Sequence, residues 1–175
     1  TEYADNIDVT TIGGTFTYDG EAHGATVTVT GLPEGSGYTV VTATSNATAT
    51  NVADGEVTAT CDNLKIVNAA GEDVTSKLKI KKIDGSITIL PKDATITVND
   101  SSKVYGEKDP AFTGTIKGLV AEGDLDPVAY VRTNTDEAVD TYTDVLSATY
   151  GTNSNYTVTV VPGDFTITPQ SIDPE

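Results

Sequence analysis

The sequence predicts an all-β protein made of two small antiparallel modules in tandem, and three observations support this prediction. β-branched residues dominate the composition, with 31 threonines and 19 valines against seven leucines and no methionine, and such side chains fit a pleated sheet. Apolar residues alternate with threonine or charged residues along many short stretches, as on strands with one buried face. The second half of the chain also repeats the pattern of the first.

Period-two alternation locates the individual strands. The stretches that we expect to form strands are residues 25–30, 38–44, 56–61, 77–83, 86–90, 94–98, 156–161 and 164–168. Asp-Gly pairs at 19–20, 54–55 and 84–85 interrupt these stretches and predict hairpin turns, because glycine adopts positive φ without steric cost.

One segment leaves the architecture open. Residues 128–150 are the longest stretch free of glycine and proline, and they have room for one helical turn around 135–139. Threonine and valine crowd this segment, so a long helix is disfavoured there. We therefore expect immunoglobulin-like sandwiches, with a β-grasp-like sheet as the alternative if the short helix forms.

An internal repeat sets the domain boundary. A shift of 78 residues places DGSITILPK, at 84–92, on PGDFTITPQ, at 162–170, and aligns Gly85 with Gly163. This pattern closes each module, so we infer a boundary near Pro91. The predicted parts are an N-terminal lead-in or preceding junction at 1–12, one module at 13–91, a second module at 92–170 and the start of a further junction at 171–175.

A short connector joins the two modules. Only Pro91, Lys92 and Asp93 separate the expected strands at 86–90 and 94–98. Proline fixes its own φ and favours extended backbone before it, so the connector should be stiff. We expect a rod rather than two modules on a flexible string.

Charge and cysteine content exclude several classes of partner and of fold. Ten basic residues against 26 acidic ones give a formal net charge of −16. Proteins that bind nucleic acid or anionic membranes carry clusters of lysine and arginine, so we expect neither partner. A single cysteine, Cys61, excludes a disulfide within the chain, and we expect it to be a small buried or half-buried apolar residue in a strand.

Motifs for catalysis are missing from the sequence. His23 is the single histidine and no Gly-x-Ser-x-Gly elbow accompanies it, so we interpret it as a turn residue that packs beside Tyr18. One cysteine and one histidine cannot supply a tetrahedral zinc site of nitrogen and sulfur ligands. No glycine-rich phosphate loop is present either. The sequence therefore predicts a protein that is not an enzyme and needs no cofactor.

Two groups of carboxylates could offer oxygen ligands to calcium. One is Asp124 with Asp126, and the other, which supplies our calcium candidates, comprises Asp136, Glu137, Asp140 and Asp144. Calcium takes about six to eight oxygen ligands, and the spacing here matches no EF-hand loop. We expect a solvated acidic face, with a weak calcium site as the alternative.

Both modules resemble bacterial repeat families. Residues 92–170 resemble the MBG repeat of the YGX type through ATITVNDSSKVYGEKDPAF, the Gly118-Leu119 step, SNYTVTV and GDFTITP. Residues 13–91 resemble the YDG-type repeat through Tyr18-Asp19-Gly20, His23, GEDVTSKLKI and DGSITILP. The MBG resemblance covers its whole module, and the YDG resemblance is looser.

These families are known as tandem repeats of large adhesin-like proteins, and the resemblance implies a location and a role. It implies an extracellular protein, attached to the cell surface through parts outside these 175 residues. The implied role is that of a stiff acidic spacer, monomeric, whose partners are the neighbouring repeats of the same polypeptide. Glycans or proteins of a host or a surface are alternative partners. The resemblance hands over no catalytic residue.

The main alternative function is a carbohydrate- or mucin-binding module. Sugars stack on flat aromatic faces, and this chain offers eight tyrosines and three phenylalanines but no tryptophan. Tyr38, Tyr130 and Tyr150 lie outside the repeated tyrosine positions, so they are the candidate ligand-binding residues.

A covalent amide bond between a lysine and an asparagine, which strengthens some surface stalks, is a further alternative. Its candidates are Lys79, Lys81, Lys82, Asn63 and Asn68. Such a bond releases ammonia, so the intact mass of the protein would reveal it.

Overall fold

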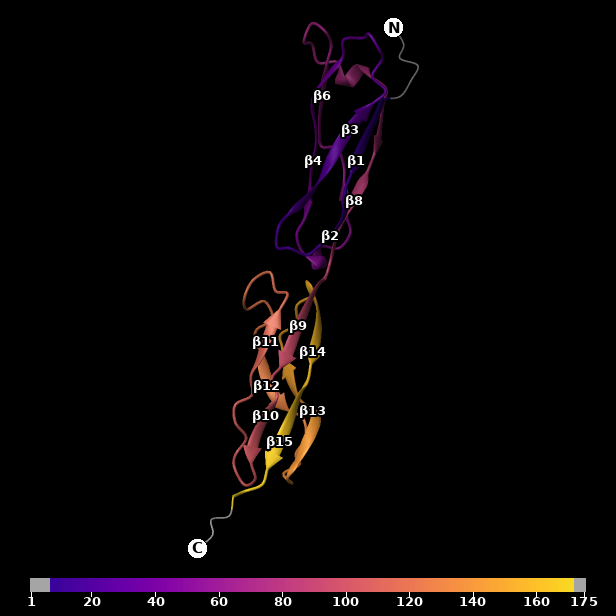
Figure 1. The fold of residues 1–175 in the computed structure, drawn as a ribbon. Helices are drawn as coiled ribbons and strands as arrows, with labels where there is room; N and C mark the ends of the chain where they lie inside the picture. The colour runs from indigo at the N-terminus through magenta and orange to yellow at the C-terminus, as the bar shows by residue number, and fades with distance from the viewer. Residues whose placement is uncertain (1–6, 172–175) are drawn as a thin grey trace. The chain divides into compact units, whose positions relative to one another are not determined.

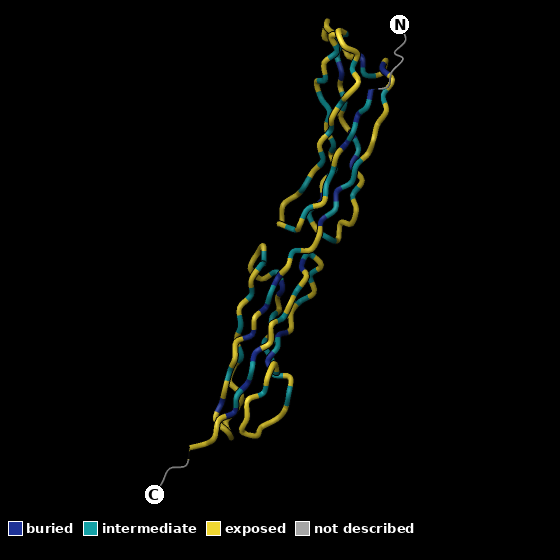
Figure 2. The backbone as a smooth tube through the Cα atoms, turned by 45° about the vertical axis from the view of Figure 1, so that its right-hand side comes forward, coloured by how far each residue is buried: buried dark blue, intermediate teal, exposed yellow. Residues whose placement is uncertain are grey.

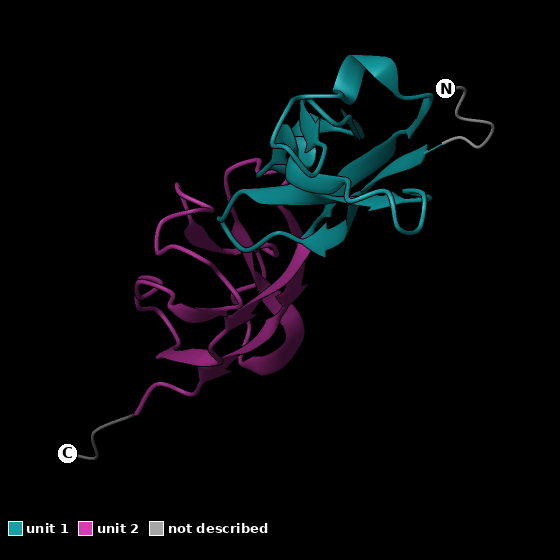
Figure 3. Ribbon diagram, turned by 90° about the horizontal axis from the view of Figure 1, so that it is seen from above, with its two compact units in different colours: residues 1–91 teal, residues 92–175 magenta. Residues whose placement is uncertain are grey.

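The structure is a computed structural model that describes residues 7–171. The chain divides into two compact units between Pro91 and Lys92, which Figure 3 colours separately. The described residues form β-strands and two single-turn 3₁₀ helices, at Val52–Asp54 and Thr75–Lys77. Residues 1–6 of the predicted lead-in and residues 172–175 of the predicted further junction lie outside the described residues.

Unit 1 is a sandwich-like pair of sheets (Figure 1). The larger sheet has the order β6-β4-β3-β1-β7, with β6 at Asn63–Val67, β4 at Thr39–Ala49, β3 at His23–Thr30, β1 at Ile7–Ile12 and β7 at Ile80–Ile83. The smaller sheet has the order β2-β8-β5, with β2 at Gly14–Thr17, β8 at Gly85–Leu90 and β5 at Val57–Ala59. Strand β1 lies inside the larger sheet, so this unit begins before residue 13.

Unit 2 also consists of two sheets (Figure 1). The larger sheet has the order β10-β15-β13-β12, with β10 at Ser101–Val104, β15 at Gly163–Thr168, β13 at Asp140–Thr149 and β12 at Ala129–Arg132. The smaller sheet has the order β11-β9-β14, with β11 at Gly114–Lys117, β9 at Lys92–Val98 and β14 at Tyr156–Val161.

Alternate residues of the strands form the cores, as Figure 2 shows by the alternation of buried and more exposed positions. In β9 the side chains of Ala94, Ile96 and Val98 are buried, whereas Thr97 between them is exposed. The side chains of a strand point to opposite faces in turn, so this pattern buries one face of the sheet. The fully buried large side chains of unit 2 are Ile96, Leu125, Leu146, Phe165 and Ile167.

The first and last strands of each unit change sheet together. In unit 1, β1 pairs in parallel with β7 in the larger sheet, and β2 then pairs in parallel with β8 in the smaller sheet. In unit 2, β9 pairs in parallel with β14 and β10 pairs in parallel with β15. The other ladders of the described residues are antiparallel. The beginning and the end of each unit therefore run side by side in the same direction.

The predicted all-β class and sandwich architecture are confirmed. Residues 135–139 form no helical turn, so the condition for the β-grasp alternative is not met. The hairpins expected at the three Asp-Gly pairs were wrong, because the strands before and after each pair lie in different sheets. These strands are β2 and β3 around 19–20, β4 and β5 around 54–55, and β7 and β8 around 84–85. Strands β7 and β8 continue in one direction.

Candidate functional site

In each unit, a glycine of the last strand lies where that strand passes close to the backbone of the first. A Cβ atom on Gly85 would lie 2.4 Å from the carbonyl oxygen of Thr11, and one on Gly163 would lie 2.8 Å from the carbonyl oxygen of Asn99. Both distances are shorter than the 3.0 Å that Cβ atoms keep from their neighbours. The glycine that recurs in the sequence repeat therefore permits the close crossing of the two strands.

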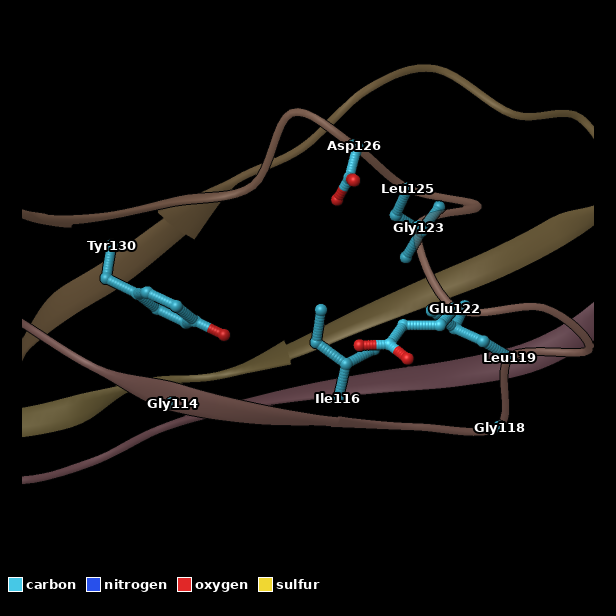
Figure 4. A pocket seen from close by; sticks show the side chains of 9 residues that line it. All are labelled: Gly114, Ile116, Gly118, Leu119, Glu122, Gly123, Leu125, Asp126 and Tyr130. Carbon is cyan, nitrogen blue, oxygen red and sulfur yellow. The ribbon is translucent and has the colours of Figure 1, made fainter.

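A pocket of about 650 Å³ opens on unit 2 between β11, the start of β12 and the segment 118–127 (Figure 4). Figure 4 shows the hydroxyl of Tyr130 and the carboxylates of Glu122 and Asp126 directed into this space. The apolar part of the lining is formed by Ile116, Leu119 and Leu125. The pocket thus combines an aromatic ring, an apolar floor and two acidic groups.

Hydrogen bonds from Tyr156 and Gly151 hold the segment 118–127 in place. The hydroxyl of Tyr156, a residue that is 6 % exposed, donates to the carboxylate of Asp124 and accepts the backbone N–H of Val120 at 2.8 Å. The backbone N–H of Gly151 donates to the carbonyl oxygen of Leu125 at 2.7 Å. Buried hydrogen bonds of this kind fix a loop against its sheet, so one wall of the pocket has a defined position.

The carboxylates of Asp124 and Asp126 have different roles. Asp124 faces Tyr156 and also accepts the backbone N–H of Ala121 at 3.2 Å, so its carboxylate is structural. Asp126 lines the pocket instead, together with Glu122. Neither Asp126 nor Glu122 forms an ion pair with a residue of the described range 7–171.

The three candidate tyrosines do not form one site. Tyr130 lines the pocket. Tyr38 belongs to unit 1, where it packs against the buried cluster that contains Ile7 and Ile66. Tyr150 follows β13 on unit 2, is 41 % exposed and is not part of the pocket lining.

The calcium candidates do not converge on one point. Glu137 binds Lys103 through Oε1 at 2.6 Å and Arg132 through Oε2, so both of its carboxylate oxygens are engaged. Asp136 accepts the side-chain amide of Asn134, and Asp140 accepts the backbone N–H of Thr141. Asp144 has a positive φ of 59° in β13, at the irregularity between Tyr142 and Leu146. Within residues 7–171, no three histidine, cysteine, aspartate or glutamate side chains lie close enough to hold a metal ion.

A network of opposite charges holds the segment after β10 on the larger sheet of unit 2. Lys103 and Arg132, both with nearly buried side chains, contact Asp109 at 2.9 and 3.0 Å and also contact Glu137. The guanidinium of Arg132 lies 4.9 Å above the ring of Phe165. The YGEKDPAF sequence supplies Asp109 to this network, so this part of the motif has a structural role.

The charge network shifts the pKa values of its members. Hydrogen bonds from Lys103 and then from Arg132 lower the pKa of Glu137. Burial raises the pKa of Asp109, but the bonds from Lys103 and Arg132 outweigh it and leave the pKa below its ordinary value. The same contacts, with Glu137 first, raise the pKa of Lys103. Both carboxylates are therefore held in the charged form.

The histidine and the cysteine have structural environments. The ring of His23 stacks on Phe16 at 4.3 Å, and its Nε2 lies 2.9 Å from a carboxylate oxygen of Asp19. A hydrogen bond from the backbone N–H of Glu21, followed by the bond with His23, lowers the pKa of Asp19. Cys61 is buried as expected, but it lies between β5 and β6 rather than in a strand.

The asparagines considered for an amide crosslink contact other groups. Asn63 donates to Thr44 at 2.9 Å, and Asn68 donates to Glu72 at 3.0 Å. Lys82 donates to the carbonyl oxygen of Cys61 at 3.2 Å. Each of these side chains thus has a hydrogen-bond partner from outside the proposed lysine and asparagine pairs.

The sequence singled out Tyr130 and Asp126 but did not bring them together with Glu122, Ile116 and Leu119. A signal for the pocket was present in the run GTIKGLVAEGDLD at 114–126, whose glycines recur at 114, 118 and 123. Two of them, Gly118 and Gly123, have φ values of 95° and 91°, which only glycine adopts readily. Such a run predicts a tightly turned surface loop.

Comparison with known proteins finds a match to one family model, over part of the chain. Neither a curated protein nor a solved structure matches it. The resemblance of residues 13–91 to the YDG-type repeat stays a prediction. Residues 94–166, which cover most of unit 2, match the family model of the MBG domain of the YGX type, a repeat found in surface proteins.

Proposed function

We propose that this chain is a non-catalytic structural segment of a secreted bacterial surface protein of the adhesin type, and that each unit acts as a stiff acidic spacer that resists tension. The match of residues 94–166 to a repeat found in surface proteins supports the structural role. The observation that carries the proposal is the parallel pairing of the first and last strands in each unit.

The parallel ladders determine how a unit responds to a pull on its two ends. In unit 2 the ladder begins with Lys92 opposite Tyr156 and continues, after the change of sheet, to Val104 opposite Thr168. Tension pulls the first strand backward and the last strand forward. Because the two strands are neighbours and point the same way, they must slide along each other. Their hydrogen bonds then carry the load together, whereas a hairpin pulled apart at one end breaks its bonds one after another.

The crossing of the strands adds to this resistance. The first strand cannot slide past the last without moving through the close contact at Gly163, where the carbonyl oxygens of Val98 and Asn99 are nearest. The backbone N–H of Asp164 also donates to the carboxylate of Asp100 at 2.8 Å at this point. Sliding therefore breaks two ladders and one side-chain bond at once.

Charge and connector support the spacer function. The net charge of −16 repels neighbouring copies and keeps them soluble. Strand β8 ends at Leu90 and β9 begins at Lys92, so Pro91 is the one residue between them. Proline allows little rotation about its own backbone, which favours a stiff junction. The partners of the spacer are then the neighbouring repeats of the same polypeptide, outside the cell.

Single-molecule force spectroscopy tests the proposal. The chain is pulled either through its two ends or through cysteines introduced as T97C and T115C, which face each other in the antiparallel pair of β9 and β11, in a C61A background. We expect unit 2 to unfold at a clearly higher force when it is pulled through its ends. Equal forces in the two directions, or a lower force through the ends, would refute the proposal.

A further inference from the structure

The pocket on unit 2 has no part in resisting tension. Its residues come from β11, β12 and the segment 118–127, none of which belongs to the paired first and last strands. The segment 118–127 nevertheless has a fixed conformation, because Tyr156 and Gly151 form hydrogen bonds with it. A spacer needs no such cavity, so the pocket points to a role beyond the proposed function.

The polar groups of the pocket are mostly hydrogen-bond acceptors. The carboxylates of Glu122 and Asp126 are hydrogen-bond acceptors, and the hydroxyl of Tyr130 can donate or accept. No lysine, arginine or histidine of the described residues neutralises these two carboxylates in an ion pair. A ligand that satisfies them must bring hydrogen-bond donors and positive charge.

The apolar part of the pocket lining further limits the kinds of ligand that fit. Ile116 and Leu119 are half-buried and lie in the lining, so a ligand in the pocket also covers an aliphatic surface. The ring of Tyr130 provides a face that attracts cations. An arginine side chain has both an aliphatic stem and a planar guanidinium with five N–H donors that fits carboxylates.

We propose that this pocket binds the side chain of an arginine presented by a partner polypeptide. The guanidinium lies between the carboxylates of Glu122 and Asp126 and beside the ring of Tyr130, while the stem covers Ile116 and Leu119. A volume of about 650 Å³ exceeds one side chain and leaves room for the backbone that carries it. The net charge of −16 attracts such a partner over longer distances.

A neutral sugar fits this lining less well. Sugar hydroxyl groups both donate and accept, and the pocket supplies no side-chain amide and no cation to donate to them. Acidic sugars and phosphates are repelled by the two carboxylates. Charge complementarity therefore favours a cationic ligand.

Nuclear magnetic resonance titration of the full chain tests the proposal with a matched pair of peptides. The first probe is acetyl-Gly-Arg-Gly-amide, and the second contains citrulline, which has the shape of arginine without its charge. We expect the arginine peptide to shift the amide signals of Gly114, Gly118 and Gly123 in a saturable manner, with a Kd on the order of millimolar. The citrulline peptide should bind at least about 10-fold more weakly.

Two charge variants show whether the pocket itself is responsible. E122Q/D126N should weaken binding of the arginine peptide by at least about 10-fold, because it removes both acidic groups at the lining. D136N/D140N removes the same amount of charge at two positions outside the pocket lining, one just before β13 and one at its first residue, and should leave the Kd within about 2-fold. These side chains are exposed, so both variants should fold.

Three results would overturn the proposal. The first is equal binding of the arginine and citrulline peptides, or equal weakening by the two charge variants. The second is the lack of any saturable shift at the three glycines. The third is saturable binding of methyl galactoside or N-acetylglucosamine at these glycines without binding of the arginine peptide, which would identify a carbohydrate site instead. None of these results depends on how the units respond to force.

Discussion

Replacement of Gly85 by alanine tests whether the strand crossing requires glycine. The new Cβ would lie 2.4 Å from the Thr11 carbonyl oxygen and 3.0 Å from the Gly13 nitrogen, whereas ordinary contacts begin at 3.4 Å. Both neighbours are backbone atoms, so the two strands must move apart by about 1 Å. Overpacking of this kind lowers the free energy of unfolding by about 1–3 kcal/mol. Alanine also reduces the conformational entropy of the unfolded chain, which raises the free energy of unfolding by about 0.4–1 kcal/mol. We expect a net loss of about 1–2 kcal/mol in the free energy of unfolding of unit 1.

The matched control is Gly24→Ala in β3. A Cβ at Gly24 would have its nearest neighbour 3.6 Å away, at the carbonyl oxygen of Ala47, and φ at this residue is not positive. This variant should be as stable as the parent or more stable by up to about 1 kcal/mol. For a unit of this size, 1 kcal/mol shifts Tm by about 4–8 °C. The two variants should therefore differ in Tm by roughly 10 °C.

Thermal melts followed through assigned amide signals measure unit 1 separately from unit 2. Gly163→Ala, with its closest contact at 2.8 Å, should destabilise unit 2 by less than Gly85→Ala destabilises unit 1. If Gly85→Ala melted at the same temperature as Gly24→Ala, the close crossing would not explain why glycine recurs in the two repeats.

Four further predictions concern single side chains and ions. Tyr156→Phe should destabilise unit 2 by about 1–3 kcal/mol, measured by urea unfolding, because Asp124 loses a buried donor. Thr11→Val should stabilise unit 1 by about 1 kcal/mol in the same assay, because the Thr11 hydroxyl is buried without a partner among the described residues. The stability of unit 2 should be constant near neutral pH and fall as the pH drops below about 4, because Asp109 and Glu137 have lowered pKa values, and Glu137→Gln should flatten part of this fall in thermal melts. Millimolar calcium should change the Tm no more than magnesium does, since the oxygens of Glu137 are already bound to cations; a rise specific to calcium would show that a site exists.

Period-two alternation predicted those strands whose buried face is regular. The stretch ATITV, for example, lies in β9, and YTVTVV is β14. The alternation fails for β13, because Asp144 has a positive φ and the register shifts between Tyr142 and Leu146. Strands β11 and β12 contain four residues each, which is too short for a period to be visible.

The crossing of the first and last strands could not be read from the sequence. Asp84-Gly85 has the composition of a hairpin turn, and local propensity gives no sign that the two flanking strands lie in different sheets. The requirement for glycine comes from Thr11, more than seventy residues earlier in the chain, so it is a tertiary constraint. The repeat of this glycine at residue 163 was visible, but its cause was not.

The pocket was predictable in part. Tyr130 and Asp126 were chosen for their chemistry, since aromatic rings and carboxylates are common in binding sites. Glu122 and Ile116 could not be assigned to the same site, because their proximity depends on the conformation of the segment 118–127. That conformation depends on Tyr156, whose hydroxyl group reaches the segment from β14.

The parallel course of the first and last strands also bears on how genes for such proteins can change. A unit whose first and last strands run the same way receives the chain at one end of its sheets and releases it at the other. If a gene holds several such units, the duplication or deletion of one leaves the path of the chain through the others unaltered. Recombination between units would then change their number without disrupting the core of any single unit.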